Sequence, residues 1–395
     1  MKTRKYNPVF GKLIALCLVV CACRNGHVTV QTADWSDVDT VIYDRDNGWI
    51  VDREAVFDSV RFIRLEATDN SLIGKADLVL FGDSTVIVAD MTISKAIFLF
   101  DFDGKYLGRM SGLGNGHNEY LYLSYVAKGR KGDFAVMDET RDRIMFFDER
   151  GHFIEEIESG VFATAFAFIN ENLMAFDISG RYPYQSSTYY NLTSAVKDRK
   201  MNDVYLFGQT GLPEGFNVSR SRNLYSFGDN VYCNVNFEDV IYQLGPDGVL
   251  ARYRLILTPD NASDYYPFKD AEELDEIWNK HDFFNGVFVE LADYSYFNIA
   301  IHNYSTGMPD LLYRHSDGLS VLLNRGFNDP MMAFLQRPRF RYGDNCLVNC
   351  IGASEVLAVK SRFGDRIGSN AKLKELYDGL ESDSNPILFF YHVAF

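Results

Sequence analysis

The residues best placed to contact a ligand in this sequence belong to a glycine-rich run, Gly112–Tyr120, which contains His117 and Glu119 as well as Tyr120. Such a run can cradle a phosphate, but a phosphate-binding loop ends in Gly-Lys-Ser or Gly-Lys-Thr and opens a helix. This run has neither feature, so we interpret it as a sharp connection between two strands. If it lies at the mouth of a binding site, His117, Glu119 and Tyr120 are the side chains expected to touch the ligand.

Two further segments resemble loops and are rich in tyrosine. The segment 181–193 carries four candidate binding residues, Tyr182, Tyr184, Tyr189 and Tyr190. A second segment carries Tyr265 and Tyr266. Exposed tyrosines offer a flat apolar face with a polar tip, which suits glycans or protein partners. The alternative, that these rings pack inside an aromatic-rich fold, stays open.

The motifs that would assign catalysis are missing from the sequence. The seven histidines are dispersed without an HExxH pair, and there is no G-x-S-x-G motif. Cys346 and Cys350 lie four residues apart in a strand-like run, which separates them by roughly 13 Å, too far for a disulfide. We therefore assign no catalytic residue, no metal ligand and no cofactor, although dispersed residues could still assemble a metal site in space.

The N-terminus has the features of an export signal. A positively charged start, with Lys2, Arg4, Lys5 and Lys12, precedes an apolar run over 13–22 that is too short for a permanent span of ~20 residues. These features indicate a signal peptide over residues 1–22 and an exported protein.

The sequence Val20-Cys21-Ala22-Cys23 resembles the bacterial lipobox. This resemblance implies cleavage after Ala22 and lipidation of Cys23, because Cys21 follows the larger, branched Val20. An ordinary signal peptide with an incidental cysteine is the alternative. We predict a lipidated tether over 23–40 and a membrane anchor at Cys23. Position 24 is not Asp, which argues against retention in the inner membrane, and the lack of an acidic run after Cys23 favours the periplasmic face of the outer membrane, with the cell surface as the other possibility.

The chain is acidic, with a formal net charge of -15 that becomes -19 when the four cations of the signal peptide are removed. Such a surface repels nucleic acid, so we expect no nucleic-acid partner. The densest basic cluster, Arg337, Arg339 and Arg341, is small.

From about residue 41 onward, short runs rich in Val, Ile, Phe and Tyr alternate with Gly, Asp and Asn, as in TVIVAD (85–90) and AIFLFD (96–101). This pattern is typical of strands. A unit of strand, glycine turn and strand recurs: its turn glycines, Gly104 and Gly151, lie 47 residues apart, and Gly248 follows after about twice that spacing. A weaker copy is expected between them, near 203–211. Repeats of this length indicate the blades of a β-propeller.

The length from residue 41 to 395 leaves room for six blades once a helical insertion at about 270–284 is subtracted. Asp270 would cap that helix with Glu273 completing a capping box, and a second short helix is expected at 371–380. We therefore predict an all-β protein, a six-bladed β-propeller over 41–395 with short helical insertions. Its terminal strand, within 385–393, would share a blade with the first strand after the tether and close the ring.

The order RLEATDNSLIGKADLVLFGDSTVIVAD, KAIFLFDFDGKYLGRM and GLGNGHNEY, with the terminal SNPILFFYHV, resembles the six-bladed propeller lipoproteins of Gram-negative gut anaerobes, which are related to NHL-repeat propellers. The similarity is strongest over 58–157. It implies a fold and an exported location, and little about activity.

Two functions are compatible with these features. The first is a binding or scaffold propeller in the cell envelope, whose partner is a glycan, a peptide or a protein. The alternative is a metal-dependent hydrolase or lyase, similar to propeller lactonases, that uses the central channel. Fold alone does not choose between them.

Overall fold

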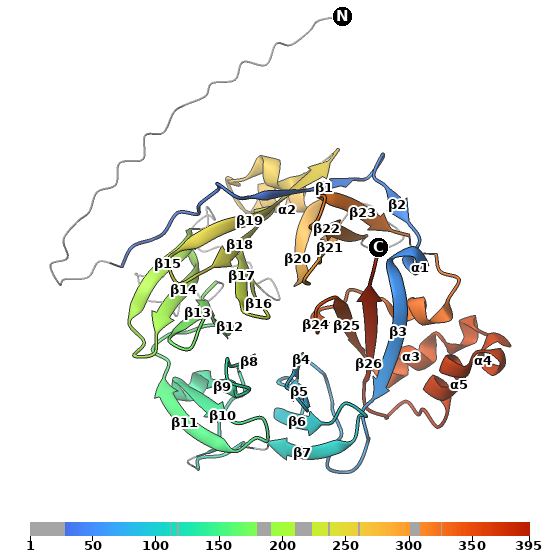
Figure 1. The fold of residues 1–395 in the computed structure, drawn as a ribbon. Helices are drawn as coiled ribbons and strands as arrows, with labels where there is room; N and C mark the ends of the chain where they lie inside the picture. The colour runs from blue at the N-terminus through green and yellow to red at the C-terminus, as the bar shows by residue number, and fades with distance from the viewer. Residues whose placement is uncertain are drawn as a thin grey trace, which may run out of the picture.

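The computed structural model describes residues 28–395 except 111, 117, 180–190, 210–222, 236–237, 260, 301–308 and 325. It confirms the predicted six-bladed β-propeller: six sheets surround a central axis, with β4, β8, β12, β16, β20 and β24 innermost (Figure 1). The inner strands of neighbouring blades contact one another around the whole ring.

The first three blades follow one another along the chain. Blade 1 comprises β4 (Leu78–Phe81), β5 (Val86–Asp90), β6 (Ala96–Phe100) and β7 (Tyr106–Met110). Blade 2 comprises β8 (Tyr125–Lys128), β9 (Phe134–Asp138), β10 (Arg143–Phe147) and β11 (Phe153–Glu158), with the 3-10 helix η1 (Glu139–Arg141). Blade 3 comprises β12 (Ala165–Phe168), β13 (Leu173–Asp177), β14 (Leu192–Asp198) and β15 (Asp203–Gln209).

The other three blades include strands from the N-terminal part of the chain. Blade 4 comprises β16 (Leu224–Phe227), β17 (Asn230–Asn234), β18 (Val240–Leu244), β19 (Val249–Thr258) and β1 (Asp39–Asp44). Blade 5 comprises β20 (Phe283–Glu290), β21 (Tyr294–Ala300), β22 (Asp310–Arg314), β23 (Leu319–Leu323) and β2 (Ile50–Val51). Blade 6 comprises β24 (Phe340–Tyr342), β25 (Cys346–Ile351), β26 (Ile387–Val393) and β3 (Phe57–Arg64).

Burial explains the hydrophobic patterns of the strands. Strands inside a blade are covered on both faces by the neighbouring blades, so β5 and β6 are buried at every position. The outer strand β19 has one covered face, and its buried and more accessible positions alternate. Continuous apolar runs in the sequence are therefore inner or middle strands.

The ring closes through β26, as predicted, but its antiparallel partner is β3. The first strand, β1, instead pairs in parallel with β19 in blade 4, and β2 pairs in parallel with β23 in blade 5. Residues 28–51 form an N-terminal strap along the rim: Val30 bridges to Leu206 in blade 3, and Asp34 bridges to Leu250 in blade 4. The described part of the predicted tether is thus bonded to two blades before β1 begins.

The turn glycines lie where the repeat predicted them, with φ of 83° at Gly104 and 84° at Gly151. The weaker copy was misplaced, because residues 203–209 form β15 itself. The matching turn in blade 3 begins at Asp198, and Met201 adopts the left-handed φ of 64° where the other copies have glycine.

The predicted insertion helix is α2 (Ala271–Trp278), and Asp270 caps it by accepting a hydrogen bond from the Glu273 amide at 2.9 Å. Its predicted end was wrong, because β20 begins at Phe283 and the fully buried Phe284 packs in the sheet core. The second predicted helix is α5 (Ala371–Tyr377).

The remaining helices are short and none of them was predicted: α1 (Arg53–Val56), η3 (Ala262–Tyr265), η4 (Pro330–Phe334), α3 (Ala353–Ala358), η5 (Lys360–Arg362) and α4 (Arg366–Ser369). Figure 1 places α3, α4 and α5 outside blade 6. None of the helices in the described ranges is long and apolar enough to cross a bilayer.

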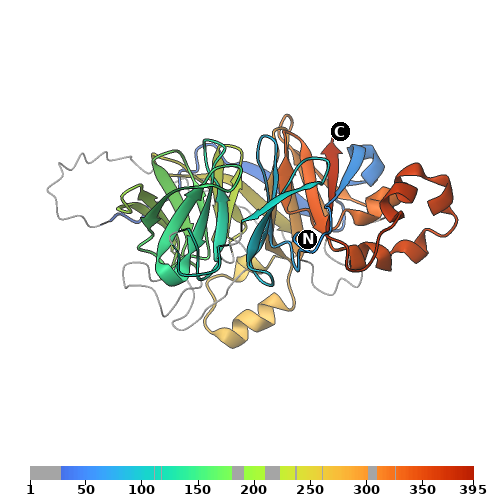
Figure 2. The same cartoon turned by 90° about the horizontal axis from the view of Figure 1, so that it is seen from below.

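The two faces of the ring differ. The inner strands all end at one face, here called the turn face, where short turns lead into the second strand of each blade. The connections between blades lie at the opposite loop face, from which α2 projects (Figure 2).

Candidate functional site

The residues predicted to touch a ligand lie at the loop face or outside the described residues. His117, Tyr182, Tyr184, Tyr189 and Tyr190 are outside the described residues, as are Ala22 and Cys23. The run 112–120 joins β7 to β8, which places it at the loop face. Ligand contact by this set stays a prediction.

Two residues of that run are well placed in the structure. Tyr120 is fully buried, and its hydroxyl donates to the Lys95 carbonyl oxygen at 3.0 Å. Burial raises the pKa of Tyr120 to about 12. The Glu119 carboxylate accepts a hydrogen bond from the Gly116 amide at 2.7 Å, within its own loop. Both side chains therefore stabilise the connection between blades 1 and 2.

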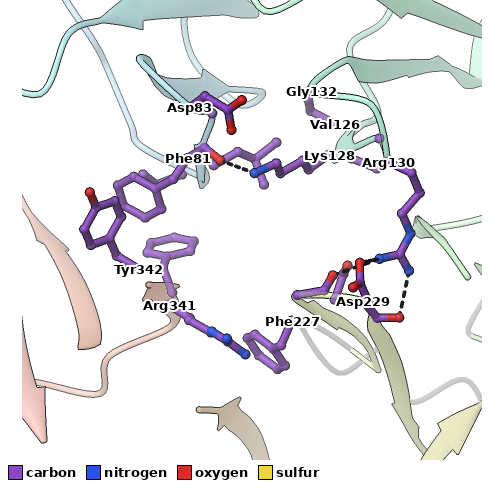
Figure 3. A pocket seen from close by; sticks show the side chains of 18 of the residues that line it. Phe81, Asp83, Val126, Lys128, Arg130, Gly132, Phe227, Asp229, Arg341 and Tyr342 are labelled. Atoms are coloured by element: carbon purple, nitrogen blue, oxygen red, sulfur yellow. Dashed lines mark hydrogen bonds and ion pairs between the residues drawn. The ribbon is translucent and has the colours of Figure 1, made fainter. Parts of the chain in front are cut away.

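One hollow of the molecule lies on the axis at the turn face. This channel-mouth cavity has a volume of about 580 Å³ and is lined by residues of blades 1, 2, 3, 4 and 6. That volume is within the range of small-molecule sites, ~300–1,000 Å³. Its lining includes five cationic side chains, Lys128, Arg130, Lys131, Arg339 and Arg341, against two carboxylates, Asp83 and Asp229. Figure 3 shows several of these side chains around its open centre.

Arg130 holds three blades together at this mouth. Its guanidinium donates to the Asp229 carboxylate at 2.7 Å and the Gly228 carbonyl at 3.0 Å in blade 4. It also donates to the Ile169 carbonyl oxygen of blade 3 at 2.9 Å. The turn that presents it contains Gly129, where an added Cβ would lie 2.1 Å from an oxygen of the Asp133 side chain and would force that carboxylate to move.

Lys128 and Arg341 each connect their own blade to a neighbouring blade. The Lys128 ammonium, at the end of β8, donates to the Phe81 carbonyl oxygen of blade 1 at 2.6 Å. Arg341, on β24, donates to the Gly343 carbonyl at 2.7 Å and to the Glu290 carbonyl of blade 5 at 3.4 Å. Among the described residues, both cations therefore hydrogen-bond to backbone carbonyl oxygens, which carry no formal charge.

Aromatic rings form much of the remaining wall of the cavity. Six of its lining residues are aromatic: Phe81, Tyr125, Phe166, Phe227, Phe340 and Tyr342. Phe81 and Tyr342 meet edge to face with ring centres 5.1 Å apart, at the seam of blades 1 and 6. Behind them, the Arg61 guanidinium lies 4.0 Å from the ring centre of Phe390. A ligand in the cavity would thus meet flat apolar surfaces beside positive charges.

Two further hollows adjoin the cavity on the turn face. The first flank, about 730 Å³, spans blades 1, 2 and 3 and shares Asp83, Arg130 and Lys131 with the cavity. The second flank, about 520 Å³, lies between blades 4 and 5 and shares Asp229 and Arg341 with it. The three hollows therefore share lining residues on this face, and we call them together the turn-face trough.

The second flank covers a buried polar cluster. The Ser295 hydroxyl lies 2.6 Å from the Glu290 carboxylate and 2.8 Å from His315 Nε2, and Tyr253 donates to Glu290 at 2.7 Å. The other ring nitrogen of His315 lies 3.1 Å from the Ala292 carbonyl oxygen, where a hydrolase triad would place its acid. Ser295 is fully buried, so the cluster lacks the exposed nucleophile of a serine hydrolase.

A smaller cavity of about 110 Å³ continues the channel toward the loop face, and Asp177 is among its lining residues. Burial raises the pKa of this carboxyl. Within the described part of the chain, no group of three His, Cys, Asp or Glu residues is arranged to hold a metal ion.

The cations of the cavity are the site residues that sequence reasoning missed. Arg339 and Arg341 belong to the basic cluster noted in the sequence, whereas Lys128 and Arg130 stand in blade 2, some 210 residues earlier. The alternation of Arg339, just before β24, with Arg341 inside it was an available signal, since alternate residues of an extended chain share a face.

Comparisons with known proteins support the fold. A family model described as a domain of unknown function, DUF4934, matches residues 41–392. A crystal structure described as a "putative exported protein" of Bacteroides fragilis is 14% identical, with a TM-score of 0.68, and the match covers 91% of this chain and 100% of that one. A member of the DUF4221 family from Bacteroides vulgatus is 10% identical, with a TM-score of 0.49, over 86% of this chain and 97% of that one. A search of the curated proteins finds no significant match.

Proposed function

The chain belongs to the DUF4934 family, and from this premise we propose that it is an exported, lipid-anchored propeller that binds an envelope ligand at its channel-mouth cavity. The observation that carries the proposal is the cavity itself, about 580 Å³ on the axis and lined by five of the six blades. A pocket with aromatic walls and a few converging polar groups is the usual form of a ligand site.

The export part of the proposal rests on the N-terminal sequence. A signal peptide over 1–22 and a lipid on Cys23 would place the propeller in the envelope, where glycans, peptides and proteins are the available ligands. The similar structure from Bacteroides fragilis, described as a "putative exported protein", supports the export part alone.

The binding part can be tested by filling the cavity. Ser226 lines the cavity and is exposed, so Ser226→Trp would place a large ring in the mouth without displacing a buried side chain. We expect the full chain, purified in detergent, to bind members of a combined glycan and peptide microarray, and Ser226→Trp to weaken that binding about tenfold or more.

Ser354→Trp is the matched control, because Ser354 is also exposed but lies on α3, outside blade 6. It should bind like the wild type. An array on which every signal is the same for wild type and Ser226→Trp would contradict binding at the channel mouth.

A further inference from the structure

The lining of the channel-mouth cavity has the opposite charge to the rest of the protein. Its five cations and two carboxylates give it a positive formal charge, whereas the chain as a whole carries -15. Of the five cations, Arg130 pairs with Asp229 at 2.7 Å and Lys131 pairs with Glu171 at 2.9 Å. Such a local concentration of positive charge would attract an anion into the mouth.

From this charge pattern we propose that the turn-face trough binds an extended polysaccharide in which uronate sugars are separated by neutral sugars. One carboxylate would sit on the axis between Lys128 and Arg341. The inference rests on the proposed function and adds the class of ligand and its seating.

The seating follows from the partners of Lys128 and Arg341. Their hydrogen bonds within the described residues go to the carbonyl oxygens of Phe81, Gly343 and Glu290. A carboxylate would give each cation a charge-assisted hydrogen bond, which is shorter and stronger than a bond to a neutral oxygen. Lys128 is on blade 2 and Arg341 on blade 6, and both line the channel-mouth cavity, so a carboxylate bound there would face cations from two sides of the ring.

The lining favours a saccharide over a peptide. An extended peptide would bind best by adding to a strand edge, but five of the six inner strands are only three or four residues long. The cavity instead offers six aromatic rings, of which Phe81, Tyr125 and Tyr342 are partly exposed. Flat aromatic rings suit the apolar face of a sugar ring.

The shape and charge of the two flanks set the length and charge spacing of the ligand. The flanks, about 730 and 520 Å³, continue the cavity on both sides, so an extended chain fits better than a single sugar. The first flank has six carboxylates against four cations. It would repel a polymer charged at every sugar, and this is why we infer spaced carboxylates.

The test uses two decasaccharides in which glucuronate alternates with a neutral amino sugar, hyaluronan and unsulfated chondroitin. The full chain in detergent should bind at least one, more weakly at high salt. Lys128→Gln and Arg341→Gln should each weaken that binding about tenfold, the expected loss of one charge-assisted hydrogen bond. Reducing the carboxylates to alcohols should have a similar effect, and a disaccharide should bind much more weakly.

Lys105→Gln is the matched control, because Lys105 is an exposed cation in the β6–β7 turn of the same face, outside the cavity lining. It should leave binding unchanged, and urea unfolding should show that all three variants are folded. Binding of neither oligosaccharide, or binding insensitive to Lys128 and Arg341, would overturn the proposal. Stronger binding of a hexaglutamate peptide would also overturn it.

These outcomes separate the two proposals. If neutral glycans bind in a way that Ser226→Trp abolishes while the uronate chains do not bind, the cavity is a ligand site of another class. If Ser226→Trp changes no binding at all, the proposed function fails as well.

Discussion

Glu290 is a buried carboxyl at the contact between blades 4 and 5, where β20 ends. It is 7% exposed and accepts hydrogen bonds from the hydroxyls of Ser295 and Tyr253. Burial raises its pKa above the ordinary value of 4.5, although those hydrogen bonds offset part of the effect. Ionising the Glu290 carboxyl in the folded protein therefore costs free energy.

That penalty has a defined pH dependence. Because the folded state keeps the Glu290 proton to a higher pH than the unfolded state, stability falls as pH rises from 4.5 through the raised pKa. Each unit of raised pKa contributes about 1.4 kcal/mol. We expect urea unfolding at several pH values to show this slope in the wild type and to show it reduced in Glu290→Gln.

Glu149→Gln is a control of opposite sign. Burial of Glu149 opposes ionisation, but hydrogen bonds from Ser84 and Thr85 prevail and lower its pKa below 4.5. Its contribution to stability is thus present above 4.5 and is lost as pH falls through the lowered pKa. A wild type and a Glu290→Gln variant with identical slopes above pH 4.5 would contradict this account of Glu290.

At the scale of elements, the N-terminal strap joins segments that are distant in sequence. It runs along blades 3, 4 and 5 before β3 completes blade 6. In β1, Val41 is fully buried in the core of blades 4 to 6, whereas the next residue, Ile42, is 52% exposed. The two residues have similar chemistry and point to opposite faces of one strand.

This pair tests how much the strap stabilises the ring. Val41→Asp would bury a carboxylate without a partner, and we expect it to lower the free energy of unfolding by about 3 kcal/mol or more. Ile42→Asp, on the exposed face, should change it by only about 0.5 kcal/mol. Equal effects in urea denaturation would mean that β1 does not pack on blade 4 as described.

The elements that sequence predicted were those set by local patterns. Continuous apolar runs and turn glycines marked the strands of blades 1 and 2, and the Asp270 cap marked the start of α2. The errors came from tertiary contacts. Phe284 joins a sheet instead of extending the helix, Met201 takes a turn position that glycine would normally hold, and β1 pairs with a strand more than 200 residues away.

At the scale of the whole molecule, the candidate site exists only because the ring closes. Lys128 and Arg341 are 213 residues apart in sequence, and they face one cavity because blades 2 and 6 both border the axis. Neither residue lies in a motif, so no local pattern could have paired them. The number of blades was predictable from the repeat length, and the contents of the channel were not.

A lipid anchor on Cys23 would limit the distance between the propeller and the membrane. Cys23 precedes Val30 by seven residues, which can span at most roughly 25 Å, and Val30 is already bridged to blade 3. A lipid on Cys23 would therefore hold the rim of blade 3 close to the bilayer. Cys23→Ser should abolish incorporation of labelled fatty acid and release the protein from the membrane fraction, and Cys21→Ser should do neither, because Val20 fits poorly at a cleavage site.

Protease treatment of cells that express the wild-type protein would show on which face of the membrane it lies. The residues after Cys23 are Arg24, Asn25, Gly26 and His27, without the acidic run typical of related lipoproteins that reach the cell surface. We therefore expect protease added to intact cells to spare the wild-type protein, and protease added after the outer membrane is permeabilised to degrade it. Rapid loss from intact cells would instead place the lipoprotein on the surface. In that case the trough would face ligands outside the cell, while the requirement for Cys23 would be unchanged.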